Sequence, residues 1–272
     1  MDINNPIGIF DSGVGGLTVV REIIRQLPSE NLVYFGDTAR LPYGSKSRDT
    51  VIRYSKQIVN FLKTKEVKAV VIACNTASAQ ALEVIHDELD IPVIGVVKPG
   101  AYVAAQTTRN GNIGIIATEG TINTHIYSSV LHEYNPKLKV IGKACPLLVP
   151  LVEEGLLEDS VTVEIASRYL NVLKETDIDT LVLGCTHYPL IRKTIGKIMG
   201  DSVTLVNPAY ETARSLKEML VEYNIFRSQG KSRYQFYVSD NTEKFDAFAN
   251  SILPVELAEA GLILIDNYGD TI

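Results

Sequence analysis

The chain has 272 residues, of which 46% are hydrophobic and 21% charged, values that fit a globular protein with a substantial core. Its net charge of −6 at pH 7 argues against nucleic acid or an anionic membrane as the main partner, because no basic region is concentrated enough to neutralise phosphates. The N-terminus has no secretory signal, and no apolar run approaches the roughly 18 to 20 residues that span a bilayer, so we expect a cytoplasmic protein.

Apolar runs typical of buried strands alternate with stretches of helical periodicity along the whole chain. The expected strands cover residues 7–10, 32–35, 69–74, 92–97, 112–118, 139–145, 179–185, 202–207 and 234–239. The expected helices cover residues 15–27, 48–65, 77–89, 120–134, 161–175, 210–223 and 243–253. Strands separated by helices predict an α/β fold in which parallel sheets are joined by right-handed crossovers.

The pattern restarts near residues 98–100, which indicates two similar α/β lobes. IGIFDSGVGGLT near the N-terminus is similar to the later IGIIATEGTINT, and AVVIACNTA is similar to TLVLGCTHY. We therefore predict one parallel-sheet lobe from residues 1–97 plus 210–272 and a second from residues 98–209. In open α/β sheets, ligands bind at the carboxyl ends of the strands, so the turns after the strands are the places to search for a site.

Two of the three cysteines are the most informative residues, because each ends an apolar run that we expect to be a strand. Cys74 precedes Asn-Thr, and Cys185 precedes Thr-His. A strand-end cysteine is usually a small core residue, but a neighbouring helix N-terminus can also make a reactive thiolate. Two such positions favour function at both. No CxxC or paired-histidine spacing predicts a metal site, and three cysteines in a reducing compartment do not make a disulfide framework.

Polar turns follow the first two expected strands. Asp11, Ser12 and the glycines after them either cap the next helix or allow backbone amides to approach a carboxylate. They match neither GxGxxG nor GxxxxGK[ST], so a nucleotide site is a weak interpretation. Residues 42–45 form either a surface turn or a substrate loop in which Tyr43 supplies a hydroxyl.

Polar residues in the second half of the chain also have two interpretations each. Thr118 and Thr121 either cap a helix or help its N-terminus to bind a carboxylate. Glu153 either lies in a solvated turn or faces the cleft and assists a catalytic group. His187 is either structural or exchanges a proton with Cys185. For Cys145, which precedes a proline, we favour a packing role.

These stretches together resemble the cofactor-independent amino-acid racemases, in the glutamate-racemising branch of the Asp/Glu racemase family. The matching stretches, spread from Asp11 to Asp240, are DSGVGGLTV, GDTARLPYG, ACNTASA, GTI, ACPLLVPLVEEG, GCTHYPLI and YVSD. The resemblance implies two α/β lobes with the active site in the cleft between them. It implies interconversion of L- and D-glutamate without a cofactor, which supplies D-glutamate for peptidoglycan, and it implies a homodimer.

The resemblance also assigns roles to individual residues. Cys74 and Cys185 match the two bases, of which Cys74 serves the D-enantiomer and Cys185 the L-enantiomer. The catalytic assistants that match are Asp11, Glu153 and His187. The substrate contacts that match are Asp11, Ser12, Pro42, Tyr43, Gly44, Ser45, Asn75, Thr76, Thr118, Thr121, Thr186 and His187. Ala117 stands where the family often has glycine, which weakens the match for that loop.

Three other functions are compatible with the residues. A racemase of aspartate or a related amino acid differs only in the side-chain pocket. A non-catalytic protein that closes two lobes on an amino acid would bind glutamate and tolerate the loss of either thiol. A thiol–disulfide enzyme would show redox activity with dithiols, but the chain lacks CxxC.

Overall fold

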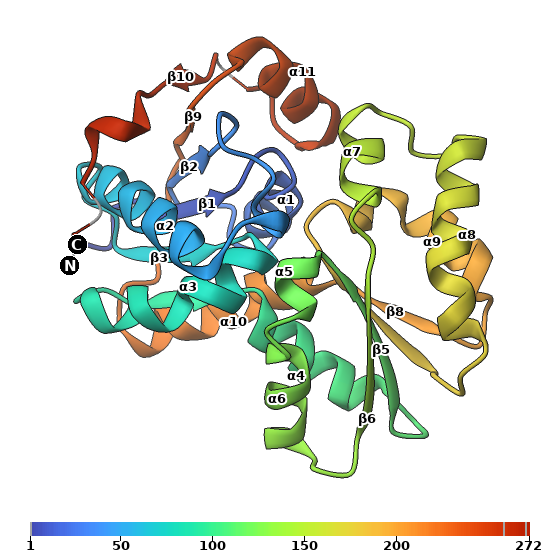
Figure 1. Cartoon of the computed structure of the whole chain (residues 1–272). Coiled ribbons are helices and arrows are strands. Elements are labelled where there is room, and N and C mark those ends of the chain that lie inside the picture. Colours follow the sequence, from blue (N-terminus) through green and yellow to red (C-terminus); the bar gives the residue numbers. More distant parts are fainter. Residues whose placement is uncertain (1, 258, 270) are drawn as a thin grey trace.

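The computed structural model describes residues 2–257, 259–269 and 271–272 and contains two parallel sheets (Figure 1). The strands of the first sheet are β1 (Ile7–Asp11), β2 (Leu32–Gly36), β3 (Ala69–Ile72), β4 (Val93–Gly95), β9 (Tyr234–Val238) and β10 (Gly261–Leu262). The strands of the second sheet are β5 (Asn112–Ala117), β6 (Lys139–Ala144), β7 (Thr180–Gly184) and β8 (Thr204–Val206).

Helices connect almost all of these strands. The α-helices are α1 (Leu17–Gln26), α2 (Arg48–Lys63), α3 (Asn75–Glu88), α4 (Val97–Thr107), α5 (Glu119–Ile122), α6 (Ile126–Tyr134), α7 (Leu148–Glu153), α8 (Ser160–Lys174), α9 (Arg192–Met199), α10 (Pro208–Glu222) and α11 (Thr242–Ile252). Short 3₁₀ helices are η1 (Tyr43–Ser45), η2 (Tyr188–Ile191) and η3 (Ile265–Asn267).

Both sheets have helices on their two faces. The first sheet has the order β10-β9-β2-β1-β3-β4 and the second β6-β5-β7-β8, and all their strand pairs are parallel. Apolar side chains of α1, α10 and α11 fill one face of the first sheet, and those of α2 and α3 fill the other. On the second sheet, α7, α8 and α9 cover one face and α4 and α6 the other. The predicted α/β fold with two parallel sheets is confirmed.

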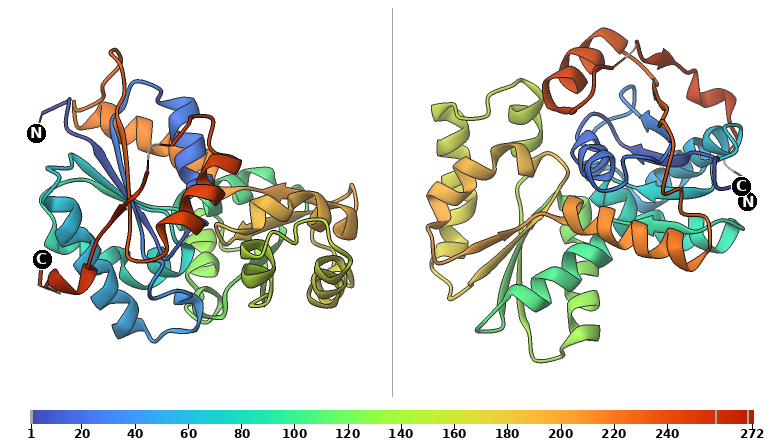
Figure 2. Two further views of the ribbon diagram at one scale, coloured as in Figure 1. Left: turned by 90° about the horizontal axis from the view of Figure 1, so that it is seen from above. Right: turned by 180° about the vertical axis from the view of Figure 1, so that it is seen from behind.

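The central strands are buried because they are apolar on both sides. All residues of β1, β2, β3 and β7 are buried, as parallel sheets between two helical layers require. Figure 2 shows the two sheets side by side, with the segments near both chain ends on the side of the first sheet. No helix in the described ranges combines the length and apolarity needed to cross a membrane.

The structure differs from the expected elements in several places, and α7, α9 and β10 are elements that the sequence did not predict. The expected helix at 120–134 is two helices, α5 and α6, because His125 between them has a left-handed backbone (φ 55°). The restart near 98–100 lies inside α4, which sequence reasoning did not predict. Pro99 lies in the first turn of α4, where the missing N–H removes no intrahelical hydrogen bond.

Candidate active site

The carboxyl ends of strands from the two sheets meet. Asp11 is the last residue of β1, and Thr186 follows β7 by two positions. The Thr186 hydroxyl approaches Oδ1 of Asp11 at 3.5 Å, and the Thr18 hydroxyl donates to the Thr186 carbonyl at 3.0 Å. The turns after β1 and β7, which belong to different sheets, are therefore in direct contact.

Cys74 forms the N-cap of α3, which begins two residues earlier than expected. Its Sγ accepts a hydrogen bond from the Ala77 amide at 3.5 Å, and the thiol reaches Oγ of Ser12 at 3.7 Å. Burial and the negative charge of Asp11 raise the pKa of Cys74 to about 12, against the opposing effects of the Ala77 amide and the Ser12 hydroxyl. Cys74 is therefore held as a protonated thiol in this state.

Cys185 belongs to a short chain of polar groups. Its Sγ lies 3.7 Å from Nδ1 of His187, whose Nε2 lies 3.0 Å from Oε1 of Glu153. Burial opposes a charge on His187, but the hydrogen bonds and negative charges of Cys185 and Glu153 outweigh it and raise the pKa to about 10. The two cysteines therefore have different electrostatic surroundings, since Cys74 lies near the carboxylate of Asp11 and Cys185 lies beside the imidazole of His187.

Asp11 is fully buried between the two cysteine sites. Its Oδ2 accepts from the Gly13 amide at 3.0 Å. Burial raises the pKa of Asp11, while the positive charge of His187 and the amides of Gly16 and Gly13 act against that rise. Neither Asp11 nor Ser12 caps α1, because its N-cap residue is Gly16 and no side chain bonds there. The amides of Gly13 and Gly16 instead approach the carboxylate of Asp11.

Gly15 is a site residue that sequence reasoning missed. A Cβ at this position would lie 2.4 Å from Oγ1 of Thr186 and 2.6 Å from the ring of His187. The contact between the two sheets therefore requires the absence of a side chain. The only sequence signal for this role is the pair of adjacent glycines. The pair suggests the close approach of a ligand, whereas in the structure the turn after β7 makes the close approach.

Three threonines join the helix starts of the two sheets. Oγ1 of Thr76, in α3, lies 2.9 Å from Oγ1 of Thr118 and 3.3 Å from Oγ1 of Thr121. Thr118 also accepts from the Thr121 amide and so caps α5. Gly44 packs against Thr118, since an added Cβ would lie 2.6 Å from Cβ of Thr118. Thr118 thus caps α5 as one interpretation predicted. The hydroxyls of Thr118 and Thr121 also cluster with that of Thr76, two residues after Cys74.

The loop of residues 42–45 lies partly outside this cluster. The hydroxyl of Tyr43 donates to Oδ2 of Asp37, and the ring is buried. The hydroxyl is therefore engaged within the first sheet, and the contact of Tyr43 with substrate stays a prediction. Pro42 and Ser45 are exposed, and Gly44 is the member of the loop that contacts the second sheet.

Both thiols are buried in this structure. Cys74 and Cys185 are each 5% exposed. Asn75 and Cys185 line a common cavity of about 10 Å³, a volume that accommodates at most one water molecule.

Other groups at the site follow from tertiary contacts. Tyr34 donates to the Gly13 carbonyl at 2.7 Å, and Tyr127 donates to Oδ1 of Asn75 at 2.7 Å. No local sequence pattern marks either tyrosine. Within residues 2–257, 259–269 and 271–272, no three metal-ligating side chains are grouped, and all three cysteines are free.

Comparisons with known proteins agree on one family. The sequence model of the family described as Asp/Glu/Hydantoin racemase matches residues 7–216. A glutamate racemase from Geobacter metallireducens is 49% identical over 254 residues, which cover 93% of this chain and 94% of the relative.

Solved structures of glutamate racemases share the fold. An isoform from Bacillus anthracis aligns with a TM-score of 0.93 and 41% identity, covering 96% of this chain and 98% of that one. The enzyme from Francisella tularensis, in complex with D-glutamate, aligns with a TM-score of 0.92 and 38% identity, covering 98% of this chain and all (100%) of that one.

Proposed function

Because this chain belongs to the Asp/Glu/hydantoin racemase family, we propose that it interconverts L-glutamate and D-glutamate without a cofactor. The observation that supports the proposal is the contact between strand ends of the two sheets, with Cys74 and Cys185 each following one of these strands. Burial and the charge of Asp11 raise the pKa of Cys74, and Cys185 lies beside His187, whose own pKa is raised. Racemisation needs such a pair, since one group removes a proton and another returns one to the opposite face.

The proposed reaction in the direction from L- to D-glutamate starts with Cys185 as the base and Cys74 as the acid. The thiolate of Cys185 removes the α-proton of L-glutamate, so the C–H bond breaks, an S–H bond forms, and the electron pair stays on the substrate. The Cys74 thiol then gives its proton to the opposite face and becomes the thiolate. D-glutamate leaves, and the reverse reaction begins at Cys74. This assignment of enantiomers follows the family resemblance.

The surrounding groups stabilise the charge that develops on the substrate. Asn75, Thr76 and Thr186 offer donors to its carboxylates, and the N-terminus of α3 adds a favourable dipole. Asp11 lies near Cys74, and Glu153 holds His187, so each thiol has its own assisting group. The burial of both thiols supports a site that excludes bulk water during proton transfer.

We further propose how the enzyme is organised and used. Residues 1–97 plus 210–272 form one lobe and residues 98–209 the other, and the lobes part to admit glutamate. This division is supported by the strand order, in which β9 joins the sheet of β1 to β4. Supply of D-glutamate to peptidoglycan, a cytoplasmic location and a homodimer are supported by the family resemblance alone.

The direct test is circular dichroism of the purified protein with L-glutamate and no added cofactor. Cys74→Ser and Cys185→Ser should each lower racemisation by at least about a hundredfold, since general acid–base groups contribute roughly 10² to 10⁴ in rate. Cys145→Ser is the matched control, because Cys145 is also buried but its thiol bonds only the Lys143 carbonyl; its activity should stay near that of the unmodified chain.

Exchange in heavy water adds a second readout. Each turnover of the unmodified chain should place deuterium at the α-carbon of the product, because the returning proton comes from the thiol that equilibrates with solvent. Full racemase activity in either single serine variant would reject the two-base scheme. Glutamate binding with no change in optical rotation would instead indicate a non-catalytic binding protein.

A further inference from the structure

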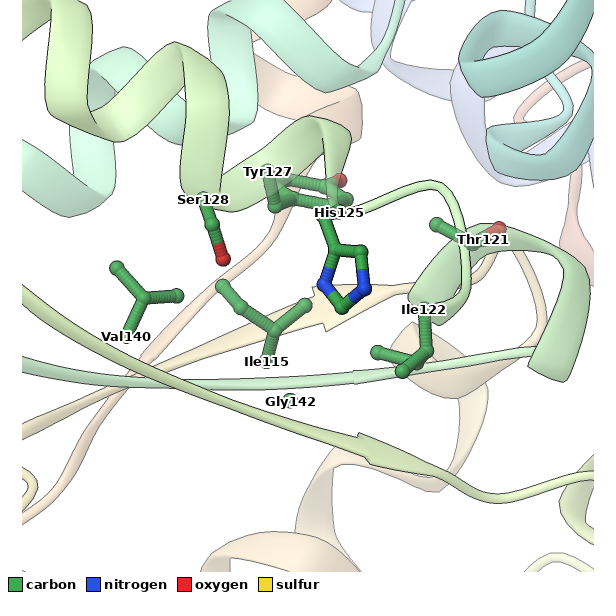
Figure 3. Close-up of a pocket in the computed structure, with 8 residues that line it drawn as sticks. All are labelled: Ile115, Thr121, Ile122, His125, Tyr127, Ser128, Val140 and Gly142. Atoms are coloured by element: carbon green, nitrogen blue, oxygen red, sulfur yellow. The ribbon is translucent and has the colours of Figure 1, made fainter.

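Tyr127 stands between the two cysteine sites without belonging to either. It lies in the first turn of α6, two residues after the left-handed residue His125. Figure 3 shows it with His125 and Ser128 at the edge of a cavity of about 200 Å³, above Ile115 of β5. The ring is 4% exposed, so its hydroxyl needs a partner inside the protein.

The partner of that hydroxyl is next to Cys74. Tyr127 donates to Oδ1 of Asn75 at 2.7 Å, across 52 residues of sequence. Burial and the negative charge of Cys185 raise the pKa of Tyr127, so the hydroxyl keeps its proton. An amide whose oxygen accepts from a tyrosine has its NH₂ group turned the other way. No hydrogen bond from Nδ2 of Asn75 occurs among the described residues, which leaves this donor for substrate.

The ring of Tyr127 is next to Cys185. A Cβ at Gly184, the residue before Cys185, would lie 3.3 Å from Cε2 of Tyr127. Asn75 and Cys185 also line the same small cavity. The hydrogen bond from Tyr127 to Asn75 therefore lies close to Cys185. The larger cavity beside Tyr127 leaves part of the ring unpacked, so the hydrogen bond to Asn75 has a large share in fixing it.

We propose that Tyr127 is a positioning residue that orients the carboxamide of Asn75 toward a substrate carboxylate and fixes the spacing of the two cysteine-bearing turns. This proposal rests on the proposed racemase function. It predicts an effect on binding more than on proton transfer, because the Asn75 donor contacts the ground state and the transition state alike.

Tyr127→Phe removes the hydroxyl and keeps the ring. We expect KM for both glutamate enantiomers to rise about tenfold, the loss of one hydrogen bond, with kcat within about twofold of the original. Tyr134→Phe on the same helix is the matched control, since Tyr134 is 41% exposed; its KM should not change. A merely structural role for Tyr127 would lower the melting temperature and the active fraction without raising KM.

A double-mutant cycle with Asn75→Ala identifies the route. If Tyr127 acts through Asn75, adding Tyr127→Phe to Asn75→Ala should raise KM no further. Independent, multiplying effects of the two changes would overturn the proposal, and so would an unchanged KM in Tyr127→Phe. Should Tyr127→Phe fold poorly, the melting temperature shows it, and Asn75→Ala alone must then reproduce the rise in KM. Racemisation by the unmodified chain is measured first, so a failure of the proposed function is distinguished from a failure of this inference.

Discussion

His187 is the residue whose charge makes the electrostatic surroundings of Cys185 differ from those of Cys74. It is buried, yet its pKa rises to about 10 because its two nitrogens contact Cys185 and Glu153. A histidine whose pKa is raised by folding stabilises the folded state fully below its unfolded pKa of about 6.5, and this contribution disappears as the pH rises through about 10. Between these values the folded protein keeps an imidazolium that the unfolded chain loses.

Glu153→Gln tests this charge. The substitution removes a negative partner, so the pKa of His187 should fall and the basic limb of the kcat/KM profile should move to lower pH. The variant should lose roughly 1 kcal/mol of unfolding free energy near pH 6, the difference between a charged and a neutral hydrogen bond, and less near pH 10. Titration of the ¹³C-labelled imidazoles by NMR measures the pKa directly.

Glu154→Gln provides the comparison for that experiment. Glu154 is the next residue, but its carboxylate is exposed and pairs with Lys244 at 3.2 Å instead of His187. Glu154→Gln should leave the pKa of His187 unchanged. A Glu153→Gln variant with an unshifted histidine would mean that Glu153 does not support the imidazolium.

At the scale of the element, one residue at the start of α3 has two roles, as the cap of the helix and as the proposed acid. Cys74 caps the helix through the Ala77 amide, and the same sulfur is the proposed acid. Sulfur is a weak acceptor, whereas serine is among the preferred N-cap residues. The cap at this position is therefore weaker than the fold could have, which is consistent with a residue selected for its chemistry.

Cys74→Ser and Cys74→Ala should separate the two tasks. Both should abolish racemisation, but they should change stability in opposite directions. The serine variant should be as stable as the original or up to about 1 kcal/mol more stable, and the alanine variant about 0.5 to 2 kcal/mol less stable. Urea unfolding followed by circular dichroism measures the difference. Equal losses of stability in both variants would show that the sulfur is not a functional cap.

The limits of prediction from sequence also appear at this scale. The main strands could be located because a buried parallel strand is an apolar run whatever surrounds it. Helix α4 could not, because Pro99 and Gly100 oppose a helix locally. In the structure Gly100 packs against Pro208 of α10, where an added Cβ would lie 2.8 Å from its ring, so a tertiary contact accounts for the glycine.

The candidate site divides in the same way. Cys74 and Cys185 could be found because strand ends of α/β sheets carry ligands, and most of their neighbours followed from the family resemblance. Tyr127 and Gly15 could not, since each acts through a residue of the other sheet that no local pattern connects to it. The engagement of Tyr43 by Asp37 likewise depends on three-dimensional packing.

At the scale of the whole molecule, the proposed active site and a buried ion pair that stabilises the fold lie at opposite ends of the first sheet. Lys68 precedes β3 at its amino end, far along the strand from Cys74. Its Nζ donates to Glu30 at 2.6 Å and to the carbonyls of Ile3 and Ile225 at 2.7 and 2.8 Å. This buried ammonium thus joins the N-terminal segment, the turn before β2 and the segment after α10.

Lys68→Met should destabilise the whole chain without changing the site. It leaves the Glu30 carboxylate buried without its cation, so the loss should be about 3 to 5 kcal/mol, or on the order of 10 °C in melting temperature. KM of the folded enzyme should stay unchanged, because no site residue contacts Lys68. Lys193→Met, which breaks an exposed pair with Glu158, should cost less than about 1 kcal/mol.

Adding Glu30→Gln to Lys68→Met should restore part of the lost stability, since the unpaired buried charge is then removed. A shift in KM with Lys68→Met would instead mean that the two ends of the sheet are coupled.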